Sequence, residues 1–451
     1  MKNIFSTLSK WTFSSDRRTF LWAVTAVALF VRLAIVIFTG NPGHPQMYEH
    51  GEIAHNLYSG HGFAMHWPYE SLDPVRLKLM KQPPQYEGAF LPPLNPYLIC
   101  GAYIVFGENP PAIISLMIFY ALVSSLIPLA VFKTGMLIGS DKPARISSLV
   151  AVIFFPAAVA VTTFSGSSLY QLLGIFILFL AILSAQKPSP KSFILLGISC
   201  GIMTMLRSEF FFLGFILIAV AIFFARKKVP TGKVLRLGVI SLLLCALVIA
   251  PWTYRNYRIF HVFIPVLSHP GYEMWRGNNI YASGTTLNAN GQPIWITSDQ
   301  YPDIIRRMDE IPYDQYFEAK VDGIFKGEVI NFIEKNPGKF LFLGLKKIAF
   351  LFTIDFNHPQ SRNPFYFGPM IIVSALTFTG LYKLIFSSQS NTHASVTIFF
   401  IFFLSYIAMT IMTVMLPRYQ IYVFSALLPL TGVGWQQIAD SVKPKEKQLI
   451  L

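Results

Sequence analysis

Long apolar runs separated by short polar segments fill most of the chain. Each run is about 16 to 22 residues long and carries few charges, which is the length a helix needs to cross about 30 Å of hydrocarbon. The runs are continuous rather than alternating, so they predict helices and not barrel strands. Ten spanning helices are expected, near 19–39, 111–132, 146–164, 168–185, 191–206, 209–225, 234–254, 366–386, 395–416 and 420–438.

Two further apolar stretches, 95–107 and 339–354, differ from these runs. The first is short and flanked by prolines, and the second carries Lys339, Lys346 and Lys347 on an amphipathic pattern. Helices of this kind lie in the plane of the membrane interface. The expected fold is therefore a single all-α polytopic membrane domain over residues 1–451, with about 10–12 helices if both stretches are counted.

Composition and charge agree with this interpretation. The chain is 53% hydrophobic and 13% charged, which excludes an ordinary soluble globular domain. With the N-terminus inside, 18 of the 36 Lys and Arg residues and 4 of the 22 acids fall in inner segments, so the whole net charge of +14 lies on the inner face. This basic balance indicates membrane orientation and anionic lipid, not nucleic acid.

Two long segments lie on the outer face in this topology, at 40–94 and 255–338. The first contains the dense polar run Tyr48–Phe63, a candidate active-site loop. The second has a turn signal at Asn290-Gly291, then a helix from about Tyr313 to Lys335. That helix has an apolar stripe formed by Phe317, Val321, Ile324, Val329 and Phe332. We expect the second segment to form a cap over the membrane helices.

Charged and aromatic residues recur where helices reach the outer face. Glu49, Glu52 and His61 lie in the first segment, Arg207 and Glu209 after the fifth helix, Arg255 and Asn256 after the seventh, Trp275 in the cap, and Arg418 and Tyr419 after the ninth. Acids and arginines at a bilayer surface often mark a functional site. They can also form local ion pairs at helix ends or extend to lipid headgroups, and the sequence leaves these alternatives open.

These motifs also carry a family resemblance. Glu49–Phe63, then Pro92-Pro93, Arg207 with Glu209, Pro251–Tyr257 and Arg418-Tyr419 together resemble the GT-C glycosyltransferases of the family 39 type, which include protein mannosyltransferases and the lipid A aminoarabinose transferase type. The resemblance implies a GT-C bundle in a bacterial cytoplasmic (inner) membrane, with its active site facing the periplasm. It also implies transfer of a sugar from a polyprenyl-phosphate donor to a hydroxyl of a glycan, lipid or protein.

The resemblance assigns chemistry to particular residues. An inverting transfer needs one carboxylate to take the acceptor proton and cations to stabilise the phosphate leaving group. Relatives usually carry an aspartate upstream of the Ile53-Ala54 pair; Glu49 is the candidate base here and Glu52 its competitor. An acid that many relatives carry after the third helix is missing from Thr162–Ser168. The donor phosphate is assigned to Arg255, Arg418 and Arg207, and other substrate contacts to Tyr419, Asn256, Glu209, His61 and Trp275.

Other functions and cofactors are weighed against this one. His55, His61 and His66 are not spaced to share one helical turn, so no metal site is predicted, although a divalent cation stays open as a cofactor. A transporter or flippase of lipid-linked sugars would place essential charges near the middle of its helices. Arg32 is such a charge, and the sequence does not identify its partner. A non-catalytic envelope-glycan assembly protein would tolerate loss of Glu49.

Overall fold

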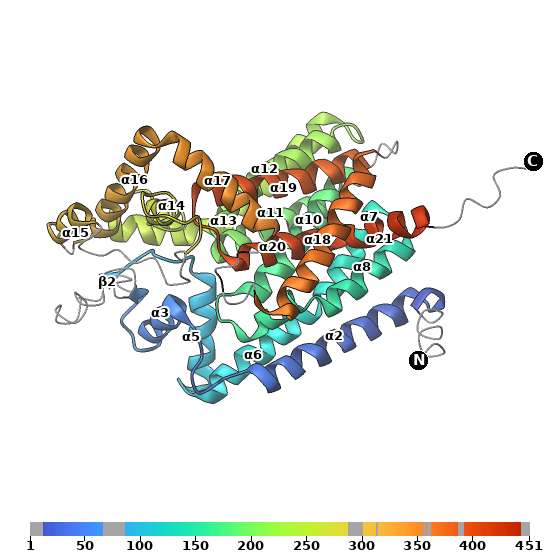
Figure 1. Cartoon of the computed structure of the whole chain (residues 1–451), viewed down its shortest axis with the longest axis horizontal. Coiled ribbons are helices and arrows are strands. Elements are labelled where there is room, and N and C mark those ends of the chain that lie inside the picture. The colour runs from blue at the N-terminus through green and yellow to red at the C-terminus, as the bar shows by residue number, and fades with distance from the viewer. Residues whose placement is uncertain are drawn as a thin grey trace, which may run out of the picture.

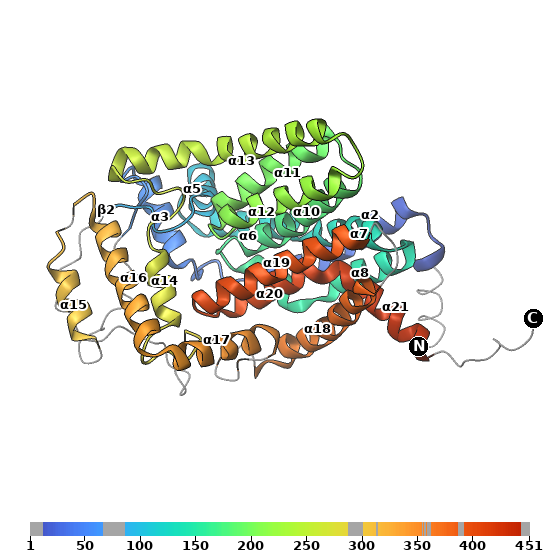
Figure 2. The ribbon, with the colours of Figure 1, turned by 90° about the horizontal axis from the view of Figure 1, so that it is seen from above.

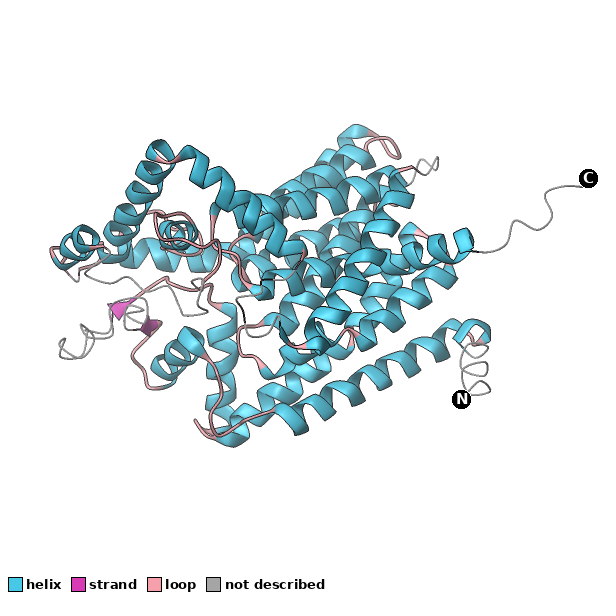
Figure 3. Ribbon diagram, in the orientation of Figure 1, coloured by secondary structure: helices cyan, strands magenta, loops and turns pink. Residues whose placement is uncertain are grey.

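The computed structural model describes residues 12–65, 86–286, 301–312, 314–353, 355, 358, 362–386 and 392–442. These residues are predominantly helical, with one small antiparallel sheet of β1 Ala64–Met65 and β2 Tyr86–Glu87 (Figure 3). The predicted all-α class is confirmed. The predicted turn at Asn290-Gly291 and the residue Tyr313 lie outside the described residues.

All ten predicted spans fall on helices. The bundle contains α2 Arg17–Thr39, α6 Pro110–Ser125, α7 Ile127–Ile138, α8 Asp141–Ile153, α10 Ser167–Gln186, α11 Pro190–Leu206, α12 Phe210–Ala225, α13 Thr231–Phe260, α18 Pro364–Ile385, α19 Thr392–Met412, α20 Pro417–Leu427 and α21 Thr431–Val442. Among the described residues, six helices are long and apolar enough to cross a membrane when α6 and α7 are taken as one. The chain is therefore a multi-pass membrane protein.

Several of the other spans are shorter or broken. The third predicted span consists of α8 and the short helices α9 Phe155–Ala158 and η2 Val159–Thr162, which bend away by 59° and form a seventh crossing if taken as one. Helices α11 and α12 are apolar but shorter than 18 residues. The last predicted span is interrupted by η4 Leu428–Leu430 between α20 and α21.

Helix α13 is longer than the predicted span 234–254. It continues to Phe260 and ends at His261, whose φ of 51° lies in the left-handed region that terminates helices. Arg255 and Asn256 therefore belong to the helix, and not to the outer segment that was expected to begin at residue 255. The chain then folds back along α13, where the Trp252 indole donates to the Val266 carbonyl at 2.7 Å and holds the returning segment.

Further helices gather at one end of the bundle, away from the start of α2 and the end of α21 (Figures 1 and 2). They are α3 Tyr48–Tyr58, α5 Leu94–Phe106, α14 Pro270–Gly277, α15 Pro302–Asp309, α16 Phe317–Lys335 and α17 Pro337–Phe352. The run expected to form a loop is largely helical, because Tyr48–Tyr58 forms α3. The predicted stripe of α16 is buried. Helices α5 and α17 match the two ambiguous stretches, and their interfacial position remains a prediction.

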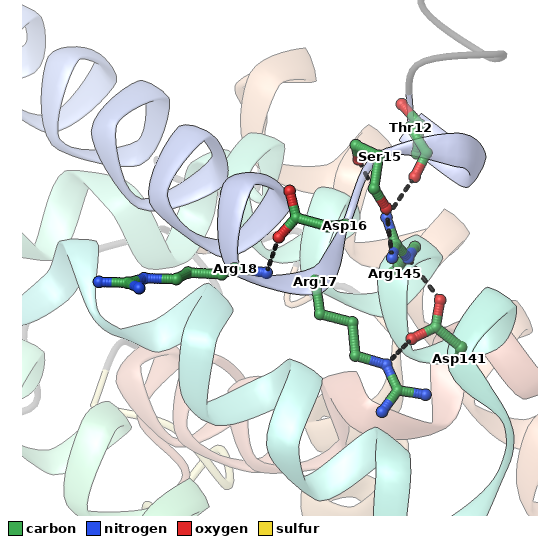
Figure 4. A network of polar contacts seen from close by, with 7 residues as sticks. All are labelled: Thr12, Ser15, Asp16, Arg17, Arg18, Asp141 and Arg145. Atoms are coloured by element: carbon green, nitrogen blue, oxygen red, sulfur yellow. Dashed lines mark hydrogen bonds and ion pairs between the residues drawn. The ribbon is translucent and has the colours of Figure 1, made fainter.

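A polar network fastens the opposite end (Figure 4). The Asp141 carboxylate of α8 accepts from Arg17 of α2 at 2.6 Å and from Arg145. Arg145 also donates to the Thr12 carbonyl at 2.7 Å and to Ser15. These residues come from two segments that the charge pattern assigns to the inner face. The structure therefore brings these predicted inner ends together.

Arg32 has its partners in α8 and α6. The side chain is fully buried and donates to the carbonyls of Val152 at 3.0 Å and Ala151 at 3.1 Å, and to Ser124 at 3.1 Å. In a continuous helix the Val152 carbonyl would accept from residue 156, but that residue is Pro156 and has no N–H. Arg32 thus supplies donors to the carbonyls that the break after α8 leaves open.

Replacing Arg32 should destabilise the fold. In Arg32→Leu, the Val152 and Ala151 carbonyls lose their side-chain donors in an apolar surrounding, so we expect the free energy of unfolding to fall by about 2 kcal/mol or more. Thermal unfolding of the purified protein in lipid nanodiscs measures this change. Arg18→Leu is the control, because Arg18 is exposed on the same helix. Equal stability of the two variants would contradict the role given to Arg32.

Candidate active site

Charged side chains from four helix ends meet at the end of the bundle that carries α3, α14 and α16. The outer-end cluster, as we call it, comprises Glu49 and His50 of α3, Arg207 and Glu209 between α11 and α12, Glu273 and Arg276 of α14, and Arg418 and Tyr419 of α20. Electrostatic interactions link them: His50 with both Arg418 and Arg207, Arg207 with Glu273, and Arg276 with Glu49. The cluster contains three carboxylates and three guanidinium groups.

The first turn of α3 is strained. Tyr48 has a φ of 50°, which is uncommon for a residue with a side chain and costs about 1–3 kcal/mol. Three residues later, Gly51 packs against Met47, where an added Cβ would lie 2.6 Å from the Met47 Cβ. Asn56 fixes the other end of α3 by donating to the Ala64 carbonyl at 2.7 Å. This geometry buries His50 and leaves Glu49 half-buried beside it.

Arg207 is surrounded by tyrosine rings. Its guanidinium carbon lies 5.0 Å from the ring centre of Tyr422, 5.8 Å from that of Tyr170 and 5.9 Å from that of Tyr419. Its Nε lies 3.4 Å from a Glu209 oxygen, close enough for an ion pair, yet neither atom has a hydrogen-bond partner within the described chain. Cation–π contacts and the ion pair thus locate the guanidinium while Nε can still donate.

Arg418 is the cation of the cluster that is most available to a ligand. It is half-buried at the second residue of α20, and its Nε is buried without a hydrogen-bond partner in the described part of the chain. Its one ring contact is with Tyr419, at 5.9 Å. Helices α12 and α20 begin beside the two arginines, and α10 begins at Ser167, which bonds Tyr422 at 2.8 Å. Helix N-termini add positive potential that favours an anion.

Helix α14 brings an acid and an arginine to the cluster from the cap. Glu273 and Arg276 form an ion pair at 3.1 Å. Burial works to raise the pKa of the Glu273 carboxyl, but the positive charges of Arg276 and Arg418 lower it below its usual value. Glu273 is therefore ionised. The helix is anchored by the Gly271 N–H, which donates to the Asp322 carboxylate of α16 at 2.6 Å.

Two buried histidines, His50 of the cluster and His269 beside it, are uncharged. Burial, helped by Arg418 and Arg207, lowers the pKa of His50 to about 3. Burial lowers the pKa of His269 to about 4, and its ring stacks on Phe90 at 3.7 Å. The Nδ1 atom of each ring is buried without a hydrogen-bond partner in the described structure. His50 can therefore exchange a hydrogen bond with a ligand bound between the two arginines.

The structure unites some of the predicted site residues. Glu49, Arg207, Glu209, Arg418 and Tyr419 all belong to the outer-end cluster. Glu52 lies one turn further along α3 and is also half-buried, so both acids remain candidates for the base. These positions come from three separate stretches of sequence, and their convergence supports a shared site.

Other predicted residues are engaged elsewhere. Arg255 donates to the Gly88 carbonyl at 2.6 Å and to Glu87 at 3.3 Å, and Asn256 donates to the Ile264 carbonyl at 3.0 Å. These contacts fasten α13 to the neighbouring outer segments. Trp275 packs in an aromatic group with Tyr301 and Phe325, and His61 is exposed. Substrate contacts by these four predicted residues remain sequence-based predictions.

Sequence reasoning missed His50, Glu273 and Arg276. His50 lies within the polar run Tyr48–Phe63, but nothing in the pattern distinguishes it from the exposed histidines nearby. Glu273 and Arg276 offered a signal, an acid and an arginine three residues apart beside Tyr272 and Trp275. That spacing places the pair on one helical face.

No group of three or more His, Cys, Asp or Glu residues within the described ranges could hold a metal ion. The expectation that His55, His61 and His66 form no metal site stays a prediction, and His66 lies outside those ranges. A divalent cation stays open as a cofactor.

The buried state of His50 predicts a pH effect. Its folded pKa of about 3 lies below the ordinary 6.5, so the unfolded chain binds more protons between these values and stability falls as pH decreases. Between pH 7 and pH 5 this amounts to about 2 kcal/mol. His50→Gln should therefore lose less thermal stability over that range than the wild type, whereas exposed His61→Gln should behave like the wild type. Equal losses in all three proteins would contradict the burial of a neutral His50.

Residues 91–254 match the family model of dolichyl-phosphate-mannose-protein mannosyltransferases. The match includes Arg207 and Glu209 of the cluster, and it excludes Glu49 and Arg418. A comparison with curated protein sequences gave no match.

Solved structures share the fold. The archaeal oligosaccharyltransferase AglB from Archaeoglobus fulgidus, in complex with an inhibitory peptide and a dolichol-phosphate, is similar with a TM-score of 0.54 and 13% identity over 96% of this chain and 53% of that chain. The Archaeoglobus fulgidus oligosaccharyltransferase tethered to an acceptor peptide gives a TM-score of 0.56 and 13% identity over 96% and 50%. This chain thus spans about half the length of those proteins.

ArnT from Cupriavidus metallidurans, bound to undecaprenyl phosphate, is similar at a TM-score of 0.42 and 13% identity over 95% of this chain and 82% of that chain, which is too weak a likeness for any conclusion. Residues 91–254 thus resemble the protein mannosyltransferases, and the similarity to the oligosaccharyltransferases shows a shared fold.

Proposed function

We propose that the protein transfers a sugar from a polyprenyl-phosphate donor to an acceptor hydroxyl on the outer face of the membrane, in one inverting displacement. The observation that carries this proposal is the outer-end cluster, where Arg207 and Arg418 keep hydrogen-bond donors without partners beside ionisable carboxylates. The dolichol-phosphate in the structurally similar AglB complex supports a lipid-linked donor. The cluster does not determine whether the acceptor is a glycan, a lipid or a protein.

The leaving group explains the arginines. In the displacement, the acceptor oxygen forms a bond to the anomeric carbon while the bond from that carbon to the phosphate oxygen breaks and its electrons pass to the phosphate. The phosphate gains negative charge in this step, so cations placed beforehand stabilise the transition state more than the ground state. Arg418 has a fork geometry suited to phosphate oxygens, and Arg207 lies close enough to share the charge.

The acceptor proton requires a carboxylate. Glu49 is our candidate base, since it belongs to the cluster, whereas Glu273 is held in the 3.1 Å ion pair with Arg276. An ion pair of that kind weakens a carboxylate as a base. Glu52 is the alternative on the same helix. Glu273 then serves to hold Arg276 and to balance the positive charge of the cluster.

The buried charges of the spanning helices favour an enzyme over a transporter. Arg32 and Arg145 are the fully buried ionic side chains within the described spanning helices. Arg32 is bonded to backbone carbonyls and Arg145 to Asp141 and the segment before α2. Both therefore have structural partners, and no chain of charges crosses the described bundle as a transport path would require.

Replacing Glu49 tests the proposed base. With purified protein in nanodiscs and a panel of polyprenyl-phosphate sugars, Glu49→Gln should lower turnover by about 10²–10⁴-fold, because a general base contributes that much, and should retain donor binding. Glu334→Gln, at an exposed acid of α16, is the control. Retained turnover in Glu49→Gln with loss in Glu52→Gln would move the base to Glu52. No donor cleavage by the wild type with any sugar would overturn the enzymatic proposal.

The outer location of the cluster can be tested by labelling single cysteines in intact cells. Tyr281→Cys, exposed near α14, should react with a membrane-impermeant maleimide, whereas Lys228→Cys should react only after the cells are permeabilised. The positive-inside rule predicts this difference. Background should be low because Cys100, Cys200 and Cys245 are buried. The reverse labelling pattern would place the cluster on the cytoplasmic side.

A further inference from the structure

The segment that carries Arg418 is fastened by the cap. Helix α19 ends at Met412 and α20 begins at Pro417, so the connection between them sets where Arg418 lies. The last carbonyls of a helix have no donors within it and need outside partners. Two come from other elements: Asn278 donates to the Met412 carbonyl at 2.8 Å, and Lys347 donates to the Ile411 carbonyl at 2.8 Å.

Lys347 links three elements at this point. It belongs to α17, and its Nζ also donates to the Asn278 Oδ1 at 2.8 Å, immediately after α14. The side chain is fully buried, and both of its hydrogen-bond acceptors are neutral. A buried lysine bonded to neutral oxygens is unusual, because methionine would fill such a space at a smaller desolvation cost. Packing alone therefore does not account for a lysine at position 347.

The connection itself packs tightly against the cap. A Cβ added to Gly277 would lie 2.0 Å from the Thr413 carbonyl oxygen, so only glycine allows this approach. The Met415 N–H donates to the Gly284 carbonyl at 3.1 Å, and Thr285 forms a parallel bridge with Met415. The connection from Ile411 to Met415 therefore runs alongside the backbone that follows α14, and Lys347 bonds its first residue.

We propose that Lys347 is a positioning residue for the donor site: by joining α17, the end of α14 and the last turn of α19, it fixes the start of α20 and thereby the Arg418 guanidinium. The inference rests on the proposed function, in which Arg418 meets the donor phosphate. It gives the cap a defined part in donor binding. The same α14 that supplies Glu273 and Arg276 also orients the arginine on α20.

Burial also affects the charge of Lys347. It lowers the pKa of the ammonium group from 10.5 to about 7. A neutral amine still has two N–H groups, which match the two acceptors Asn278 and Ile411. The link can therefore persist whether or not the group is protonated.

The dissociation constant of undecaprenyl phosphate, which carries no sugar, reports on the contact between Arg418 and the donor phosphate. In Lys347→Met we expect the dissociation constant to rise about tenfold, because the contact between Arg418 and the phosphate is weakened. Lys346→Met is the matched control; that side chain lies over Phe350 on the same helix and should bind like the wild type. Lys347→Arg, which keeps a donor, should recover part of the affinity.

A double-mutant cycle separates positioning from a general effect on stability. If Lys347 acts through Arg418, adding Lys347→Met to Arg418→Gln should cause no further loss of binding. Additive losses, or wild-type binding in Lys347→Met, would overturn the inference while leaving the proposed function intact. Should Lys347→Met fail to fold, Asn278→Ser breaks the same link and must show the same non-additivity. Unchanged binding in Arg418→Gln would instead refute the proposed donor site itself.

Discussion

The structure depends on the need to satisfy backbone polar groups where membrane helices break. A helix inside a bilayer bonds its own N–H and C=O groups, and any interruption exposes carbonyls that water cannot reach. This protein closes each of three breaks with a side chain from another helix. Arg32 donates to the end of α8, Lys347 donates to the end of α19, and Gln420 of α20 donates to the Thr353 carbonyl after α17 at 2.8 Å.

These breaks also build the site. The bend after α8 returns the chain to the start of α10, where Ser167 reaches Tyr422 beside Arg207. The break between α19 and α20 presents Arg418, and the break between α11 and α12 presents Arg207. Because continuous helices would carry the backbone past the membrane surface without a turn, the same interruptions that create unsatisfied carbonyls also place the charged residues together.

The cluster combines charges with a low-dielectric surrounding. Three carboxylates accompany three guanidinium groups, and buried His50 and His269 remain neutral beside them. Charges interact more strongly here than in water, so the arrangement needs near balance to be stable without a ligand. Arg207 is surrounded by tyrosines and paired with Glu209, whereas Arg418 makes fewer contacts. This difference distinguishes a cation that is held in place from one that can meet a ligand.

The sequence by itself determined the all-α multi-pass class and the ten apolar segments that fall on helices, and it predicted one orientation and the candidates Glu49, Arg207, Glu209, Arg418 and Tyr419. Length, hydropathy and charge are properties of each segment alone, and the membrane acts on each segment in the same way. Only the tertiary structure decided that the polar run forms α3, that Arg255 of α13 bonds Gly88 and Glu87, and that Glu273 and Arg276 enter the outer-end cluster. It also supplied the partners of Arg32 and Lys347. Those outcomes depend on contacts between residues tens to hundreds of positions apart, which no local pattern encodes.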